Sequence, residues 1–129
     1  LGLLEVETTL LPDKTLTRVS GTHDPSGAEI TGYEIHLGTT HGTDTARPFA
    51  MIDGKPDGAI TRSGQVMGTY LHGCFGSDAF RSAFLASLGA ESSRLRFDER
   101  IETTLDDLAR HIENHIDVDR LLALAEPVR

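Results

Sequence analysis

The sequence predicts an α/β fold in which strands come first and helices follow. Gly, Thr and Pro separate short runs of β-favouring residues up to about Gly76, whereas Ala, Leu, Arg and Glu dominate after it. A chain of 129 residues is long enough for one hydrophobic core, and the sequence has no internal repeat and no linker that would separate two domains. We therefore expect a single domain over residues 1–129, with strands and loops mostly in 1–76 and helices mostly in 77–129.

Six short runs of β-favouring residues predict the strands. These runs are residues 3–7, 15–20, 29–36, 49–52, 58–62 and 65–71. Ser63 and Gly64 join the last two runs and favour a tight hairpin, because glycine accepts a positive φ at little cost. Residues 21–27 and 38–48 are rich in Gly, Thr, Asp and Pro, and we expect them to form loops.

The first predicted helix follows Ser77, which is a good N-cap residue, and ends near Gly89, which suits a helix C-terminus. Apolar residues recur at helical spacing along this segment, so one face of the helix is expected to be buried. The side chains predicted on that face are Phe80, Phe84, Leu85 and Leu88.

Two further helices are predicted in the last third of the chain. The second begins at Thr103 or Thr104 and ends at His115. Its inward-facing side chains are predicted to be Leu105, Leu108 and Ile112. The third covers residues 117–125, and Pro127 is expected to end the regular structure.

The charge balance argues against nucleic acid as a partner. The chain has 12 Lys and Arg residues against 20 Asp and Glu, a formal net charge of −8 that opposes binding to a phosphate backbone. No apolar run approaches the roughly 20 residues needed to span a bilayer, and Glu5 and Glu7 lie where a signal peptide would carry positive charge. The single cysteine, Cys74, cannot form an internal disulfide. We expect a soluble, cytoplasmic protein with no membrane contact.

No cofactor or metal site is expected from the motifs in these residues. The sequence has no Gly-x-x-x-x-Gly-Lys-Ser/Thr loop, no Gly-x-Gly-x-x-Gly and no Gly-x-Ser-x-Gly. His111 and His115 have the spacing of a zinc pair, but Glu113 is not directly after the first histidine, as a metalloprotease motif requires. We expect this pair to lie near the C-terminal end of its helix and to interact with the helix dipole. His23 and His41 are expected to be solvated in polar loops.

One predicted strand carries a carboxylate and an imidazole on the same face. Strand alternation places Glu34 and His36 on one side and Tyr33 and Ile35 on the other. The two polar side chains could hydrogen-bond each other or serve a shared site. The alternative is an exposed polar face on an edge strand.

The segment Tyr-Leu-His-Gly at 70–73 places His72 at a strand end, where an imidazole can act as a general base for a nucleophile supplied from elsewhere. The alternative is a partly buried histidine that the backbone satisfies. Cys74 follows two residues later and suggests a Cys-His pair. Side chains two apart on an extended strand are about 7 Å apart, and proton transfer needs about 3 Å. Only a sharp turn after His72 would bring the two together, and we expect Cys74 to fill space in a half-buried position.

Several motifs in the same order and spacing resemble the cobyric acid synthase family. They are Gly-Tyr-Glu-Ile-His-Leu-Gly at 32–38, Arg-Pro-Phe at 47–49, Asp-Gly-Ala at 57–59, and Gly-Thr-Tyr-Leu-His-Gly at 68–73 followed by Phe75. The resemblance extends from Gly-Leu-Leu at 2–4 and Lys-Thr-Leu at 14–16 through the Leu-rich helices, so it covers nearly the whole chain. Several ordered motifs over this length make the match specific.

The resemblance implies the C-terminal part of a class I glutamine amidotransferase-like domain with a flavodoxin-like fold. In this family a cysteine thiolate attacks the glutamine amide, a histidine manages the protons, and ammonia is released. His72 matches the catalytic histidine, whereas the nucleophilic cysteine of the family lies upstream of this region and Cys74 does not match it. The segment alone is therefore expected to be inactive.

The resemblance also implies what the longer enzyme does. Ammonia serves the ATP-dependent amidation of adenosylcobyrinic acid a,c-diamide in cobalamin biosynthesis. An N-terminal synthetase domain would bind ATP and Mg2+, so the implied partners are that domain, glutamine and the corrinoid substrate. The apolar Leu-Gly-Leu-Leu start suggests a piece of a larger sheet, and an open sheet edge would favour self-association.

Cys74 also departs from the general class I pattern. Those amidotransferases carry a Glu two residues after the histidine, and a thiol cannot hold an imidazolium as a carboxylate does. The family that this chain resembles also lacks that Glu, which implies either a Cys-His pair without a third residue or another acid. We take Glu34 as a candidate orienting acid. Two alternatives remain open: a related amidase such as cobyrinate a,c-diamide synthase, which carries a second histidine two after the first, and a non-catalytic interaction domain with the same fold.

Overall fold

The computed structural model describes residues 2–91 and 96–125, apart from the side chains of Asp13 and Thr15. The chain divides into two compact units, Leu1–Arg94 and Leu95–Arg129. Within the described residues the strands all lie in the first unit, and helices follow them. This is the order that the sequence predicts.

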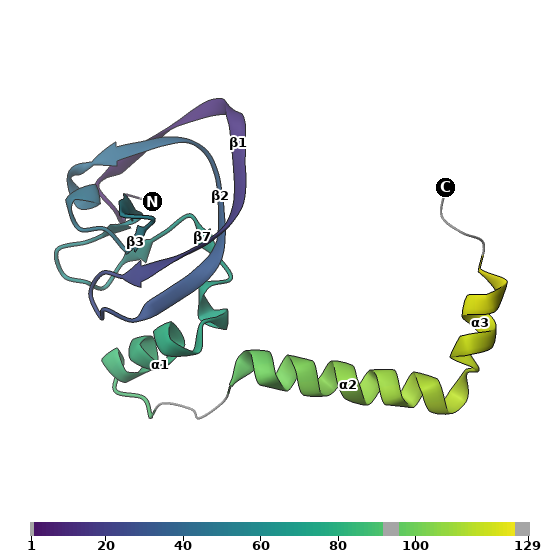
Figure 1. Cartoon of the computed structure of the whole chain (residues 1–129). Coiled ribbons are helices and arrows are strands. Elements are labelled where there is room, and N and C mark those ends of the chain that lie inside the picture. Colours follow the sequence, from purple (N-terminus) through teal and green to yellow (C-terminus); the bar gives the residue numbers. More distant parts are fainter. Residues whose placement is uncertain (1, 92–95, 126–129) are drawn as a thin grey trace. The chain divides into compact units, whose positions relative to one another are not determined.

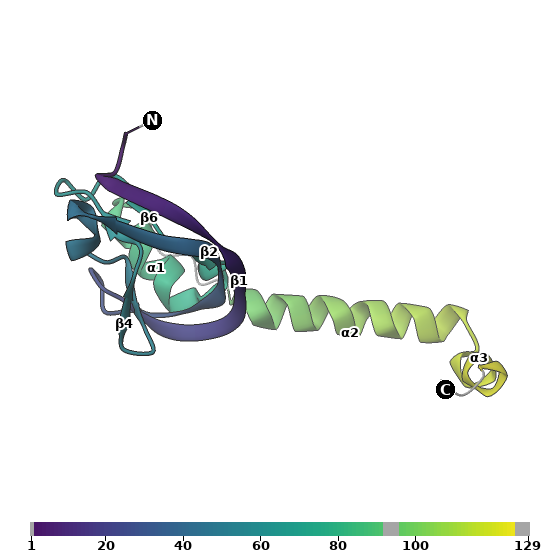
Figure 2. The same ribbon diagram turned by 90° about the horizontal axis from the view of Figure 1, so that it is seen from above.

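Two long antiparallel strands, β1 (Val6–His23) and β2 (Glu29–Gly42), form the framework of the first unit. Figures 1 and 2 show them running side by side as one curved pair. Their ladder is interrupted once, between Thr9 and Lys14. The structure thus corrects the expectation of two separate strands at 3–7 and 15–20, since one continuous strand contains all of the second and only Val6 and Glu7 of the first.

Strand β2 also continues beyond its predicted end into residues 38–42, which composition assigns to a loop. Pairing with β1 outweighs the weak strand preference of this Gly- and Thr-containing segment. The Thr8 and Thr40 hydroxyls, directly opposite each other, are 2.8 Å apart and hydrogen-bonded. The remaining loop contains a short 3-10 helix, η1 (Thr43–Ala46).

The other strands are short. β3 (Ala50–Ile52), β4 (Lys55–Asp57) and β7 (Leu71–His72) complete a five-stranded antiparallel sheet in the order β4-β3-β1-β2-β7. β5 (Ala59–Ile60) and β6 (Met67–Gly68) form a separate antiparallel pair, which confirms the predicted hairpin with a shorter ladder than expected.

The predicted strand at 65–71 is divided into β6 and β7 by a side-chain interaction. The Thr69 hydroxyl donates to the Asp57 carboxylate and accepts the backbone N–H of Leu71 at 3.0 Å. Because a side chain satisfies this N–H, the ladder does not continue through Thr69.

The core of the first unit lies beside helix α1 (Asp78–Ser87). It consists of Val19, Ile30, Phe49, Ala50, Ile52, Ile60, Leu71, Cys74 and Phe80, with Met67 and Phe84 packed against it. Phe80 is fully buried, as predicted, and Phe84 and Leu85 are half-buried. Leu88 is 67% exposed, which corrects its predicted burial, because the helix has already ended at this residue.

Helix α1 ends where the sequence predicts, through a glycine in the left-handed conformation. Gly89 has φ 75° and donates its N–H to the Ala86 carbonyl at 3.0 Å. Ala90 donates to the Leu85 carbonyl, also at 3.0 Å. These two bonds form a Schellman motif, which satisfies carbonyl groups that the last helical turn leaves unpaired.

The second unit consists of α2 (Phe97–His115) and α3 (Val118–Leu124). α2 begins earlier than the predicted Thr103 or Thr104, because both hydroxyls donate to the carbonyls of the residues four positions before them rather than capping a helix start. Its end at His115 is as predicted. Asp117 is the N-cap of α3 and accepts the N–H of Arg120 at 2.9 Å. Pro127 lies outside the described residues.

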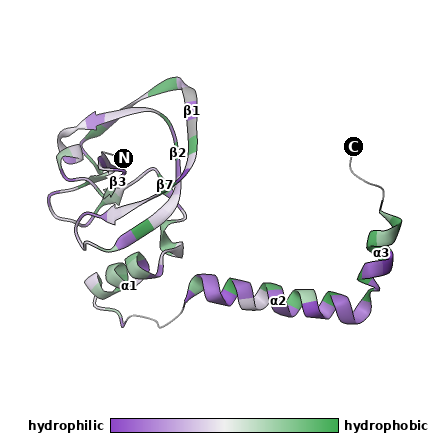
Figure 3. Ribbon diagram, in the orientation of Figure 1, coloured by the Kyte–Doolittle hydropathy of each residue, from purple (hydrophilic) through white to green (hydrophobic). Residues whose placement is uncertain are grey.

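The apolar residues of α2 are not buried, contrary to expectation. Leu105 and Leu108 are each 52% exposed and Ile112 is 40% exposed. Figure 3 shows hydrophobic and hydrophilic residues alternating around this helix. An amphipathic helix gains most of its stability from covering its apolar face, and α3 does not bury these side chains within their own unit.

His23 is buried in the first unit, which corrects the expectation of a solvated loop histidine. It ends β1, is 5% exposed, and its ring lies 4.9 Å from those of both Phe49 and Phe80. Its Nδ1 is 2.7 Å from the Ser26 hydroxyl, while its Nε2 is buried without a hydrogen-bond partner in the described structure. Burial lowers the pKa of His23 below its ordinary value, and the charge of Asp24 offsets part of this effect.

We expect acidification to destabilise the first unit through His23. The unfolded chain takes up a proton near the ordinary histidine pKa of about 6.5, whereas the folded chain resists protonation to a lower pH. The free energy of unfolding should therefore fall as the pH drops below about 6.5 and level off below the folded-state pKa. Urea unfolding of wild type and His23→Gln between about pH 5 and 7.5 measures this. The slope should be smaller in His23→Gln and unchanged in His41→Gln, which alters an exposed histidine.

We expect the uncovered face of α2 to drive self-association at high concentration. Replacing Leu105 by Glu should lower the apparent mass in light scattering towards that of a monomer, because a charge would have to be buried on association. Thr103→Glu is the matched control, since it adds the same charge on the opposite side of the helix. A wild-type chain that stays monomeric at millimolar concentration would contradict this expectation.

Candidate functional site

His72 lies at the end of β7, as the sequence predicts, and its side chain is exposed. Strand β7 pairs with β2 so that His72 is opposite Tyr33 and Leu71 is opposite Glu34. Directly opposed residues share a sheet face and consecutive residues take opposite faces. Leu71 is buried and His72 is exposed, so the sheet has an inner face that contains Leu71 and an outer face that contains His72. The alternative of a partly buried His72 is wrong.

A sharp turn does follow His72, but it does not bring Cys74 to the imidazole. Gly73 adopts the left-handed conformation with φ 76°, and η2 (Cys74–Gly76) begins directly after it. The turn carries Cys74 into the core, where it is 7% exposed. Burial raises the pKa of the Cys74 thiol, partly offset by backbone hydrogen bonds. Cys74 thus fills space, as predicted, but it is buried in the core rather than half-buried, and its thiol is poorly suited to nucleophilic attack.

Close backbone contact holds β7 against β2. Gly32 lies beside the strand end, and a Cβ atom at this position would be 2.4 Å from the His72 carbonyl oxygen and 3.0 Å from the Leu71 side chain. The backbone N–H of Ile35 donates to the Tyr70 carbonyl at 3.0 Å. The position of His72 therefore depends on a glycine in the neighbouring strand.

The inner face of β2 carries the second predicted site. Glu34 Oε1 and His36 Nδ1 are 3.3 Å apart, so the expected proximity of carboxylate and imidazole is confirmed. Their orientation lies outside hydrogen-bond geometry, so the buried His36 Nδ1 has no hydrogen-bond partner in the described structure. The edge-strand alternative is wrong, because β2 lies between β1 and β7.

A cavity of about 510 Å³ adjoins this pair. Its polar lining includes Glu34, His36, Thr8, Thr40, Asp57, Thr69 and Tyr70. The Tyr70 ring packs against His36 with centroids 5.0 Å apart, and its hydroxyl is 2.5 Å from Thr40 Oγ1 and 3.2 Å from Thr8 Oγ1. Sequence reasoning missed these hydroxyl groups, since they meet only because β1 and β2 pair beyond their predicted ends.

The structure does not bring Glu34 and His72 together. Glu34 is opposite the buried Leu71, and His72 is opposite Tyr33, so the two candidate side chains leave opposite faces of the sheet. Glu34 contacts His36 instead. A carboxylate that orients His72 would have to approach from the outer face.

Other residues of the sequence motifs have structural roles. Asp44 is 5% exposed, pairs with the Arg47 guanidinium, and accepts the backbone N–H of Glu5 at 2.8 Å. Arg47 Nε also donates to the Ile60 carbonyl at 2.9 Å. Phe49 is buried in the core. These contacts connect η1 and the residue that follows it to Glu5, directly before β1, and to Ile60 of β5.

The paired histidines of α2 form no larger cluster. Their rings stack with centroids 4.3 Å apart, and His115 Nδ1 is 2.7 Å from the His111 carbonyl in the last turn of the helix. Across residues 2–91 and 96–125, no group of three or more His, Cys, Asp or Glu is arranged to hold a metal ion. In the same residues no helix has both the length and the apolar character needed to cross a membrane.

Comparison with known proteins gives consistent matches. Residues 1–80 match the family model described as a CobB/CobQ-like glutamine amidotransferase domain. The chain is 63% identical over 125 residues to a protein of Cereibacter sphaeroides named cobyric acid synthase, which covers 97% of this chain and 26% of that protein. Proteins of the same name from Rhodobacter capsulatus and Bradyrhizobium diazoefficiens are 54% and 52% identical, again over 97% of this chain and 26% of each relative.

The chain therefore spans about a quarter of the length of the curated relatives that it matches. No solved structure matches it.

We expect Gly32→Ala to displace β7 and the His72 side chain with it. The added methyl group would overlap the His72 carbonyl, and overpacking of this kind costs about 1–3 kcal/mol of stability. Urea unfolding measures the loss, and the amide chemical shifts of residues 70–73 report the displacement. Gly68→Ala is the matched control, since its Cβ would meet only the end of the Leu4 side chain at 3.2 Å. Equal effects of the two substitutions would contradict the role given to Gly32.

Proposed function

This chain belongs to the family of CobB/CobQ-like glutamine amidotransferase domains, and from this premise we propose that it is the part of a cobyric acid synthase that takes ammonia from glutamine. Identities of 63% and 54% to proteins of that name, over 97% of the chain, support the proposal. The observation in the structure that carries it is an exposed imidazole, His72, held at the end of a short strand by close contact with β2.

In the proposed reaction, a cysteine thiolate attacks the side-chain carboxamide of glutamine, the C–N bond breaks and ammonia leaves. Water then hydrolyses the glutamyl thioester to glutamate. His72 takes the proton of the thiol and gives it to the leaving nitrogen, which are general base and general acid steps. Histidine is the side chain most often used for both steps.

The nucleophile is proposed to come from outside these 129 residues. Cys74 is the single cysteine of the sequence, and it lies in the core with a raised thiol pKa, whereas His72 lies on the outer face. A thiol in that position can neither reach the substrate nor ionise readily. The cysteine that attacks glutamine is therefore expected elsewhere in the longer protein.

The wider reaction is proposed from the relatives' name. Ammonia would be used for the ATP-dependent amidation of adenosylcobyrinic acid a,c-diamide in cobalamin biosynthesis. A separate synthetase domain would bind ATP, Mg2+ and the corrinoid, since these 129 residues contain no phosphate-binding loop. We also propose a cytoplasmic location and, for the complete glutaminase domain, a flavodoxin-like sheet to which the antiparallel strands described above are added.

We expect His72→Ala in the longer enzyme to lower ammonia release from glutamine by at least about 100-fold, because proton transfer to and from the substrate is lost. Cys74→Ala should retain activity within about threefold, since it changes only a small buried side chain. A coupled assay for ammonia measures both. The 129-residue chain alone should release none.

The same assay tests Glu34 and the non-catalytic alternative. If Glu34 orients His72, as the sequence suggests, Glu34→Gln should lower turnover. The position of Glu34 on the opposite face of the sheet favours unchanged turnover. If the unmodified longer protein releases no ammonia from glutamine at any concentration, the glutaminase assignment is wrong and an interaction domain with this fold is favoured.

A further inference from the structure

A chain of hydrogen bonds leads from β4 to the strand that carries His72. The Asp57 carboxylate at the end of β4 accepts the hydroxyl of Thr69, and the same hydroxyl oxygen accepts the backbone N–H of Leu71 at 3.0 Å. Leu71 directly precedes His72 in β7. A threonine whose hydroxyl binds the N–H two residues ahead forms an ST-turn, which bends the backbone locally. Thr69 therefore sets the direction in which the chain enters β7.

Close backbone contact brings Asp57 to Thr69. Gly58 has φ 74°, and a Cβ atom at this position would be 2.2 Å from the Gly68 carbonyl oxygen and 3.1 Å from the Thr69 Cα. A glycine, which has no Cβ, permits this approach. The Asp-Gly-Ala motif and the Gly-Thr-Tyr-Leu-His-Gly motif of the sequence thus meet in one contact.

Tyr70, the residue between Thr69 and Leu71, is held as well. Its hydroxyl lies within hydrogen-bond distance of the hydroxyls of Thr8 in β1 and Thr40 in β2. Its carbonyl accepts a backbone N–H of β2 at 3.0 Å. The segment before the histidine is therefore fixed from β1, β2 and β4 together.

Strand β7 depends on such support because it is only two residues long. Its ladder with β2 consists of the pairs Tyr33–His72 and Glu34–Leu71. A shift by one residue would exchange the faces that Leu71 and His72 take and would turn the imidazole towards the core. Two pairs provide few contacts that hold one register. By binding the N–H of Leu71, Thr69 fixes which residue of β7 faces the core.

We propose that Thr69, held by Asp57, is a positioning residue for His72 in glutamine hydrolysis. The inference rests on the proposed glutaminase function. Neither Thr69 nor Asp57 touches the substrate. They hold the backbone of β7 so that the imidazole keeps the distance of about 3 Å that proton transfer requires. A displacement of about 1 Å is enough to slow such a step about 100-fold.

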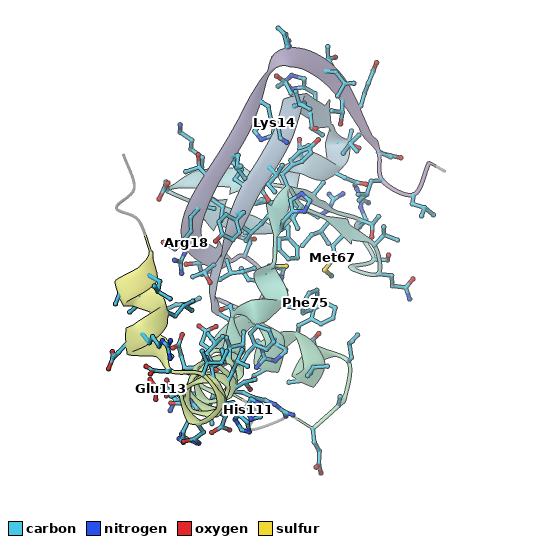
Figure 4. All side chains as sticks on the ribbon, turned by 90° about the vertical axis from the view of Figure 1, so that its right-hand side faces the viewer. Lys14, Arg18, Met67, Phe75, His111 and Glu113 are labelled. Atoms are coloured by element: carbon cyan, nitrogen blue, oxygen red, sulfur yellow. The ribbon has the colours of Figure 1, made fainter. Side chains whose placement is uncertain are left out.

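Thr61 is the matched comparison, because it makes the same kind of contact without a link to β7. Its hydroxyl donates to the Val66 carbonyl and accepts the Val66 N–H, both at 3.2 Å, and so closes the loop between β5 and β6. Thr61 and Thr69 are both half-buried. Figure 4 labels Met67, directly after this loop, and Phe75, which lies beyond β7.

Glutaminase kinetics in the longer enzyme test the proposal. Thr69→Val removes the hydroxyl and should lower kcat for ammonia release about 10- to 100-fold with KM for glutamine within about threefold, because substrate binding is untouched. Thr69→Ser keeps the hydroxyl and should retain kcat within about threefold. Thr61→Val should lose a similar amount of thermal stability and keep kcat within about threefold, which separates positioning from stability.

Two further measurements tie the effect to Asp57 and to glutamine hydrolysis. Asp57→Ala should lower kcat by a similar factor, and combining it with Thr69→Val should lower kcat no further, because both residues act through one chain of hydrogen bonds. Amidation with ammonium chloride in place of glutamine should be the same in Thr69→Val and wild type, which also shows that the variant is folded.

Several outcomes would overturn the proposal. A kcat of Thr69→Val within about threefold of wild type removes the positioning role, and a Thr69→Ser enzyme as impaired as Thr69→Val excludes the hydroxyl as its cause. An equal loss of kcat in Thr61→Val, or of ammonium-supported amidation in Thr69→Val, shows only a stability effect. Additive losses in the double variant separate Thr69 from Asp57. If wild-type enzyme releases no ammonia from glutamine, the proposed function fails first, so the two failures are distinguishable.

Discussion

The antiparallel pairing of β1 and β2 determines where every candidate residue of this chain lies. Because side chains alternate along a strand, the register assigns each residue of β2 to one of two faces. Ile30, Glu34 and His36 share the inner face with the core and the cavity. Tyr33 is on the outer face with its partners in β1 and β7. A shift of the pairing by one residue would exchange the two sets, so the register decides which candidate residues share a face.

Much of this arrangement can be predicted from the sequence, because it depends on local signals. Alternation predicts that Glu34 and His36 lie together, the glycine at 89 predicts the end of α1, and the motif at 70–73 predicts a histidine at a strand end. The expectation that Cys74 would not serve His72 also holds, although the reason is the turn at residue 73 rather than strand spacing.

What could not be predicted depends on contacts between distant parts of the chain. His23 is in a polar segment, but Phe49 and Phe80 cover it, and neither is near it in sequence. The extension of β2 through residues 38–42 requires a partner strand that composition does not reveal. The opposite error occurs in α2, where an apolar stripe predicts burial that the second unit does not supply. For Glu34, the strand face was predicted correctly. Its separation from His72 could not be predicted, because the face that His72 takes depends on the pairing of β7 with β2.

The separation of the two faces constrains the rest of the proposed active site. An imidazole exchanges a proton with a thiol only at about 3 Å, so the cysteine that acts with His72 must approach the outer face. That face also exposes large apolar side chains, with Leu16 62% and Leu37 42% exposed. Exposed apolar surface of this kind is typical of a site that another segment covers. A segment that supplied the cysteine would cover these residues and exclude water from the reaction at the same time. The cavity lined by Glu34 and His36 lies on the inner face, so such a segment would approach the side of the sheet opposite to the cavity.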